Sequence, residues 1–303
     1  MVSLSSSAQQ RGGSTTLAIA LSHRIKVIPH RPQTLPWFFK RIWRLCQLLA
    51  LLTDGFVRTE QVEVRFDGDH EGFSLFYAPA NRGRVIGRPS SLCFFYLANV
   101  SPQFGSIIDM WLYTSEILLE AINLFSIGRD WTDSLEMRFL LLCQSLEVYS
   151  RATSDSEYMP AESYESVKAT IINSIPATVE PSHRVKLKSQ ITFGNEYSLR
   201  KRVENMLESL QPATVQLICV SPSKFVAGLV ATRNYLTHYT DELRAEALRG
   251  SDLHWASEKI ALLMRVVLLR YLGLPEEVVR ERVNQHPRLA QCLLIAGNHQ
   301  EAL

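Results

Sequence analysis

Cysteine is scarce and irregularly placed in this sequence of 303 residues, which limits what thiols can contribute. The five cysteines are widely spaced and contain no Cys-x-x-Cys pair: Cys46, Cys93, Cys143, Cys219 and Cys292. Neither a disulfide framework nor a thiolate zinc site is expected from such a set. Cys143 and Cys219 stand in apolar runs and are expected to pack as small hydrophobic side chains, a pattern that favours a reducing cytoplasm.

Long apolar runs and a strong charge imbalance are also absent. No stretch reaches the roughly 18 uncharged apolar residues of a membrane-spanning helix, and Leu17–Leu21 is too short for a signal-peptide core. The net charge is only +2, so any basic surface must be local. With 46% hydrophobic and 20% charged residues, the composition is that of a globular chain of one large or two ordinary domains. We therefore expect a soluble, cytoplasmic protein with no membrane partner.

Several nucleotide- and metal-binding signatures are missing as well. The sequence has no Walker loop, no Rossmann glycine pattern and no His-Glu-x-x-His zinc motif. His70 with Asp67 and Asp69 is the nearest thing to a metal-ligand group, but these residues stand in a glycine-containing turn between predicted strands. We accordingly expect no metal and no cofactor.

The predicted secondary structure of the sequence changes in character near residue 100. Residues 1–16 are rich in Ser, Gln and Gly and are predicted to be disordered. Strands are predicted over Arg24–Pro29, Gln61–Phe66, Phe73–Tyr77 and Leu92–Tyr96, and a helix over Leu35–Leu52. Beyond residue 100 the helical period predicts helices at about 105–126, 133–152, 161–174, 182–193, 196–210, 222–244, 251–272 and 275–284. The predicted fold is mainly α, with a helical bundle over 101–303 after a small α+β region with a few antiparallel strands over 1–100.

One residue pair in the helix predicted over 222–244 suits RNA cleavage. Arg233 and His238 have four residues between them, a spacing shared by Arg65–His70 and Arg249–His254, but only this pair lies within a long helical pattern. RNA carries its own nucleophile, the 2′-hydroxyl; a histidine can transfer its proton, and an arginine can stabilise charge on the phosphate, without a metal. An Arg and a His on one helix are more often structural, so both interpretations stay open.

The helical wheel indicates the surroundings of this pair. Arg233 falls among core-facing residues and needs an acidic partner, for which Glu147 on the helix predicted over 133–152 is suitable. Glu147 pairing with Arg151 on its own helix is an equally good alternative. Asn234 and His238 share a face with two alanines, which would let a second subunit approach and supply a second histidine.

A basic cluster follows the predicted helix over 161–174. It contains six basic residues and one tyrosine able to stack on a base, against a single acidic residue, and its weakly predicted RNA-binding members are Arg184, Lys186, Lys188, Tyr197, Arg200, Lys201 and Arg202. A solvated charged face is the somewhat better interpretation of such a cluster.

The segment Ala231–Tyr239 resembles the Arg-x4-6-His motif of the HEPN superfamily of helical nucleases, in the common form with Asn after Arg. Met137–Tyr149 is similar to the earlier helix of the ApeA-like HEPN branch, whose inward acidic residue matches Glu147. Leu269–Pro275 is also similar, and the resemblance covers about 105–285. Arg44–Gly55 and the strands after it resemble the end of the ApeA N-terminal domain, which is usually longer. Its β-rich first half is not found here, which leaves open a complete protein or a shortened relative.

The resemblance implies a HEPN-type bundle with metal-independent endoribonuclease activity, a homodimer through the HEPN domain, RNA as partner and a role in antiphage defence. By this match Arg233 and His238 are catalytic, and Asn234 and Glu147 support them. The alternative is a non-catalytic HEPN interaction or scaffold module, and a third possibility is an inactive fragment of a longer defence protein. The intact Arg-Asn-x3-His motif favours the nuclease.

Overall fold

The computed structural model describes residues 2–13, 16–54, 57, 59, 61–65, 73–75, 93–114, 116–130 and 134–286. Backbone contacts divide the chain into two compact units. The first comprises Met1–Cys46 and Arg58–Asn81, and the second comprises Gln47–Val57 and Arg82–Leu303. The candidate site and its supporting helices all belong to the second unit.

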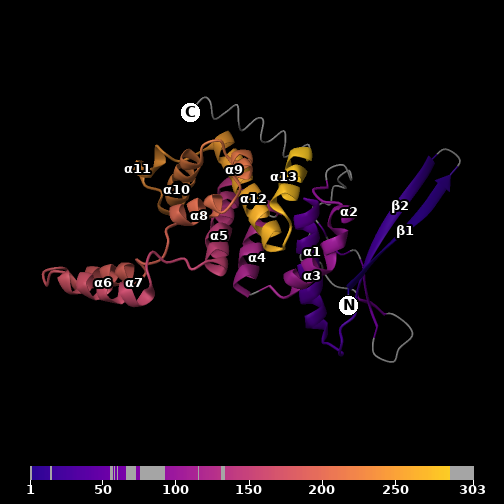
Figure 1. The fold of residues 1–303 in the computed structure, drawn as a ribbon, viewed down its shortest axis with the longest axis horizontal. Coiled ribbons are helices and arrows are strands. Elements are labelled where there is room, and N and C mark those ends of the chain that lie inside the picture. Colours follow the sequence, from indigo (N-terminus) through magenta and orange to yellow (C-terminus); the bar gives the residue numbers. More distant parts are fainter. Residues whose placement is uncertain are drawn as a thin grey trace. The chain divides into compact units, whose positions relative to one another are not determined.

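The first unit contains two small antiparallel sheets (Figure 1). Strand β1 (Val2–Gly13) pairs with β2 (Thr16–Val27), with Val2 opposite Val27, and β3 (Val62–Val64) pairs with β4 (Phe73–Leu75). The strands predicted over 61–66 and 73–77 are thus confirmed for 62–64 and 73–75, while 66, 76 and 77 lie outside the described residues. The prediction of disorder over 1–16 is wrong for 2–13, because this polar segment finds its backbone hydrogen bonds along β2.

Helix α1 (Leu35–Thr53) ends at Asp54, whose φ of 51° stops the helix. The amides of Phe94 and Phe95 donate to the carbonyls of Thr53 (3.4 Å) and Leu52 (2.7 Å) at this end. The strand predicted over 92–96 is therefore wrong for 93–96. Both phenylalanines are buried, but their amides satisfy free carbonyls at a helix end instead of a neighbouring strand.

A buried charge cluster holds the end of α1 within the second unit. The carboxylate of Asp54 accepts a hydrogen bond from Arg265 of α12 (Gly250–Tyr271) and lies 3.7 Å from Arg129 of α4 (Glu116–Asp130). The side chains of all three are at most 9% exposed. Charges this deep are stable only when paired, so the cluster fixes which helices meet at Asp54.

The rest of the second unit is helical (Figure 1). After α2 (Leu97–Val100) and a short 3-10 turn, η2 (Ser101–Gln103), come α3 (Phe104–Leu112), α4 (Glu116–Asp130), α5 (Leu135–Thr153), α8 (Leu199–Glu208), α9 (Pro212–Ile218), α10 (Pro222–His238), α11 (Asp241–Arg244), α12 (Gly250–Tyr271) and α13 (Glu276–Gln285). Helix α12 is buried from Ile260 to Leu269 and contacts α4, α5, α9 and α13. It is the most extensively buried helix of this unit and packs against these four helices.

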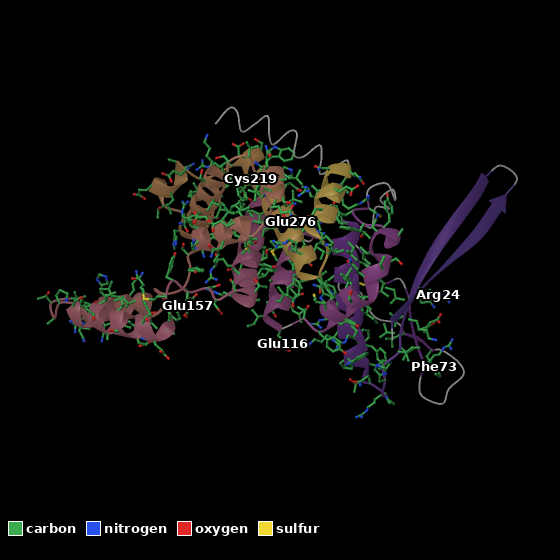
Figure 2. The ribbon with its side chains drawn as sticks, viewed as in Figure 1. Arg24, Phe73, Glu116, Glu157, Cys219 and Glu276 are labelled. Carbon is green, nitrogen blue, oxygen red and sulfur yellow. The ribbon has the colours of Figure 1, made fainter. Side chains whose placement is uncertain are left out.

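Glu276, labelled in Figure 2, links three of these helices. Its carboxylate accepts from the amide of Gln211 at the start of α9 (2.7 Å) and lies 3.2 Å from Arg270 of α12. A carboxylate at a helix N-terminus satisfies a free amide and complements the helix dipole. The residue thereby positions α9, which directly precedes the helix of the candidate site.

The remaining two helices, α6 (Ala161–Ser174) and α7 (Pro181–Thr192), lie side by side as a hairpin between α5 and α8 (Figure 1). Among their described residues none is buried. The two ends of the hairpin lie next to each other and are joined by backbone hydrogen bonds. The Tyr158 amide donates to the Asn195 carbonyl (2.9 Å), and the Tyr197 amide donates to the Ser156 carbonyl (2.8 Å). Glu157, labelled in Figure 2, lies at this base and forms a β-bridge with Glu196.

The helix predictions are confirmed for 133–152, 161–174, 182–193, 251–272 and 275–284 to within a few residues, and that over 196–210 is confirmed with a later start. Two are wrong: 105–126 is broken between α3 and α4, and 222–244 is broken after His238. Helix α9 was not predicted. In the described part of the chain no single helix has the length and hydropathy to cross a bilayer, and α9 and α10, which pass this test only together, are bent by 47°.

Candidate active site

Helix α10 presents the Arg233–His238 segment from a firmly packed base. Ser221 and Pro222 stand at its N-cap and first position, as predicted, and Phe225, Val226 and Leu229 are buried beneath it. Thr232, fully buried, donates to the Gly228 carbonyl (2.6 Å) and accepts from the Leu248 amide (2.9 Å). These contacts fix the segment before α12 onto α10 one residue before Arg233.

Arg233 is paired with Glu147 across α10 and α5. Its Nη2 lies 3.3 Å from Glu147 Oε1, and the two side chains are 35% and 19% exposed. Nη1 of the same guanidinium donates a long hydrogen bond of 3.5 Å to Asn234 Oδ1. Arg151, the alternative partner of Glu147, instead pairs with Glu196 at 2.7 Å. Three of the four predicted site residues therefore form one connected group, with the arginine half-exposed and available to a ligand.

The helix face under Glu147 is apolar. Cys143, one turn before it on α5, is 1% exposed, and burial, helped by the negative charge of Glu147, raises the pKa of its thiol far above the ordinary value. A thiol held protonated is a poor nucleophile. Cys143 is therefore not suited to act as a nucleophile beside the ion pair of Glu147 and Arg233.

His238 is the last residue of α10, and its side chain is exposed. Within the described residues its imidazole makes no hydrogen bond or ion pair, and none links it to Arg233. Ala227, on the same face, is exposed as well, while Ala231 and Asn234 are partly exposed. The face that carries His238 is thus accessible along its length, both to a ligand and to another protein surface.

The basic cluster does not form a single surface. Arg184 donates to the carbonyls of Ile175 (3.0 Å) and Pro176 (2.7 Å), where it closes the end of α6, whereas Lys186 and Lys188 are exposed on α7. On α8, the side chain of Arg202 is only 2% exposed and lies 3.5 Å from Glu196.

The other three members lie in or beside α8. Arg200 pairs with Glu204 at 3.8 Å, Lys201 is half-buried, and the ring of Tyr197 packs edge-on against Tyr158. Burial lowers the pKa of Arg202, and its Nε donates to the Tyr197 carbonyl (2.9 Å), so this arginine has a structural environment. Of the predicted RNA-binding set, Lys186 and Lys188 are the side chains most open to a phosphate.

The metal-like group of Asp67, Asp69 and His70 lies outside the described residues. Among the described residues, no three His, Cys, Asp or Glu side chains are grouped so that they could hold a metal ion. Nearer the site, the structure adds a feature that the sequence analysis passed over. Helix α10 stops at His238 because Tyr239 adopts a left-handed conformation, and the residue that follows the histidine is therefore an exposed aromatic outside the helix.

Comparison with protein families gives two matches. Residues 140–278 match the family model described as Apea-like HEPN, and residues 2–111 match the one described as ApeA N-terminal domain 1. The first match contains Glu147, Arg233 and His238. No curated protein and no solved structure matches the chain.

Proposed function

The chain consists largely of an ApeA N-terminal domain 1 followed by an Apea-like HEPN domain, and on this premise we propose that it is a metal-independent endoribonuclease. The observation that carries the proposal is the ion pair between Arg233 of α10 and Glu147 of α5, together with the exposed His238 at the end of α10, whose imidazole makes no hydrogen bond within the described residues. The carboxylate holds the guanidinium in place, while about a third of the arginine side chain stays open to a phosphate.

In the proposed reaction the substrate supplies the nucleophile. The 2′-oxygen attacks the adjacent phosphorus and forms a new O–P bond while the bond from phosphorus to the 5′-oxygen breaks. A histidine takes the 2′-proton, a second one protonates the departing 5′-oxygen, and the products carry a 2′,3′-cyclic phosphate and a 5′-hydroxyl. Arg233 stabilises the negative charge that grows on the phosphate oxygens.

A second histidine is needed because one imidazole cannot easily act as base and acid in a single step. We propose a homodimer through the α10 face of Ala227, Ala231, Asn234 and His238, where small side chains permit close approach of an identical helix. Ala231→Arg should then yield monomers by analytical ultracentrifugation and lose cleavage. A dimer that survives Ala231→Arg would place the interface elsewhere.

The decisive experiment treats total tRNA and mRNA with the purified full-length protein in the presence of EDTA. Wild type should cut and leave cyclic phosphate ends, and His238→Ala should not. His30→Ala is the matched control, since His30 is also exposed and makes no side-chain hydrogen bond within the described residues. Because His238 is exposed, its replacement should change the stability by no more than about 0.5 kcal/mol, so a loss of cleavage would not be due to unfolding.

The alternative function is a non-catalytic HEPN interaction or scaffold module. A stoichiometric partner that co-purifies, together with equal inactivity of wild type and His238→Ala on RNA, would favour it. If the nuclease proposal holds, we further propose that the protein acts in the cytoplasm as an antiphage defence effector. Phage plating on cells that express wild type or His238→Ala tests that role.

A further inference from the structure

Tyr239, the residue after His238, is an exposed aromatic in an unusual backbone conformation. It has φ 53° and ψ 37°, and its amide donates to the Tyr235 carbonyl (2.7 Å) to end α10. Glycine or asparagine normally fills this position, because a β-carbon disfavours the left-handed region. The side chain of Tyr239 is nevertheless 66% exposed. A large aromatic side chain therefore stands at a position where the left-handed backbone disfavours a β-carbon and where the ring is exposed to solvent.

Such conformations are rare in this protein. Among the described residues, Asp54 is the one other non-glycine residue with a positive φ, and its side chain is buried in ion pairs that account for its placement. Tyr239 is exposed and, within the described residues, has no buried ion pair of this kind. Strained backbone of this kind, when no packing explains it, is found mainly at binding and catalytic sites.

Two neighbours extend the ring into a larger surface. The ring of Tyr235 lies 5.4 Å from that of Tyr239 at an interplanar angle of 57°. The guanidinium of Arg249 lies over the Tyr235 ring, 5.4 Å from its centre. Nη2 of Arg249 donates to the Arg244 carbonyl (2.9 Å), but within the described residues Arg249 has no carboxylate at ion-pair distance, and the residue is exposed. Aromatic rings beside an uncompensated guanidinium suit a nucleotide, which offers a flat base and an anionic phosphate.

We infer that Tyr239 is a stacking surface for an RNA base next to the phosphate at His238, with Arg249 available to a neighbouring phosphate. The inference rests on the proposed nuclease function, since it names a substrate contact of the same site. Bases in a duplex are covered by their neighbours, so the ring selects single-stranded RNA. Every base has a flat face, so stacking here gives affinity with little sequence preference.

The test measures RNA binding in a protein that cannot cut. In the His238→Ala background, Tyr239→Asn removes the ring but keeps a residue that tolerates the left-handed backbone, and Tyr239→Phe keeps the ring. Tyr113→Asn is the matched control, because Tyr113 is 83% exposed at the end of another helix of the same unit. The probe is a short fluorescein-labelled single-stranded RNA of mixed sequence, followed by anisotropy at several salt concentrations.

Loss of one stacked base weakens binding about 5- to 150-fold, so Tyr239→Asn should raise Kd by that factor. The dependence of log Kd on log salt should stay the same, because the ring carries no charge. Tyr239→Phe and Tyr113→Asn should bind like the parent. A melting temperature that stays equal or rises in Tyr239→Asn would show that the loss of affinity is not a loss of fold.

Unchanged affinity in Tyr239→Asn would overturn the inference and leave the nuclease proposal standing. A fall in sedimentation mass with Tyr239→Asn would also overturn it, since the ring would then serve contact with a second copy of the chain. If the His238→Ala parent binds no RNA and wild type cuts none, the proposed function fails and the inference fails with it.

Discussion

Glu147→Gln should show how far the ion pair organises the site, because the change keeps the size of the side chain and removes its charge. Two unit charges at the observed 3.3 Å attract by about 1 kcal/mol in water and about 5 kcal/mol at an effective dielectric of about 20. The side chains are 35% and 19% exposed, so solvent screening and desolvation reduce the gain. We expect a net coupling of about 1–2 kcal/mol, above that of an exposed pair and below that of a buried one.

Urea unfolding of wild type, Glu147→Gln, Arg233→Gln and the double variant gives this coupling as a double-mutant cycle. The matched control is Glu165→Gln with Lys168, an ion pair on α6 whose carboxylate side chain is 66% exposed. Its coupling should be no more than about 0.5 kcal/mol. If both cycles gave the same small value, the Glu147–Arg233 contact would have no organising role.

The same variant has a consequence for cleavage. Without its carboxylate partner the guanidinium samples other positions, and kcat/KM should fall about tenfold, which corresponds to about 1.4 kcal/mol. Glu147→Asp keeps the charge and should recover part of the loss, whereas Arg233→Ala removes the phosphate contact itself and should be worse. Full activity in Glu147→Gln would refute the reasoning that Glu147 positions Arg233.

Three further predictions concern stability. Asp54→Asn removes the negative charge that faces the buried Arg129 and Arg265 and should cost about 3–5 kcal/mol in urea unfolding, whereas the exposed control Asp109→Asn should cost no more than about 0.5 kcal/mol. Tyr239→Gly relieves the left-handed backbone and should raise the melting temperature in calorimetry. Burial raises the pKa of the Cys219 thiol from 9.0 to about 11, so its stabilising contribution is complete below pH 9 and is lost as pH rises toward 11. Cys219 and Cys143 should accordingly resist iodoacetamide in the native protein and react in urea, as mass spectrometry would show.

The helix of the site was predictable in its start but not in its end. Ser221 and Pro222 carry strong start signals, while no glycine or proline marks the stop. The end of α10 is instead indicated by the start of the next helix. Thr240 is the N-cap of α11, and Asp241 and Glu242 form its acidic first turn. Because a new helix start implies the end of the previous helix, this N-cap signal places the end of α10 near His238.

The first hundred residues were harder to read. The polar composition of Val2–Gly13 predicted disorder, yet the register with Thr16–Val27 makes it a strand, and pairing partners are not visible in local composition. Phe94 and Phe95 gave the apolar pattern of a strand, but they belong to a segment that caps the end of α1. A buried capping segment needs apolar side chains as much as a buried strand does. The domain division near residue 100 stays a prediction.

In the candidate site, the sequence spacing allows Glu147 to pair with either Arg233 or Arg151. The observed pairing depends on a third residue, Glu196, which is distant in the sequence. Glu196 at the base of the hairpin binds Arg151, which leaves Glu147 to Arg233. Such competition depends on distances between segments far apart in the sequence. The same limit applies to Arg202, whose burial beside Glu196 a list of basic residues does not reveal.

The α6–α7 hairpin, called the arm below, is joined to the rest of its unit at one point, so its length can vary independently of the helices on either side. Because Tyr158 and Asn195 are joined by a backbone hydrogen bond, the chain returns almost to the point where it left, and the helices between them can change length without moving α5 or α8. Loop closure costs rise only slowly with the length of an insertion. An insertion or deletion within this arm should therefore leave the ion pair of Glu147 and Arg233 with its present geometry.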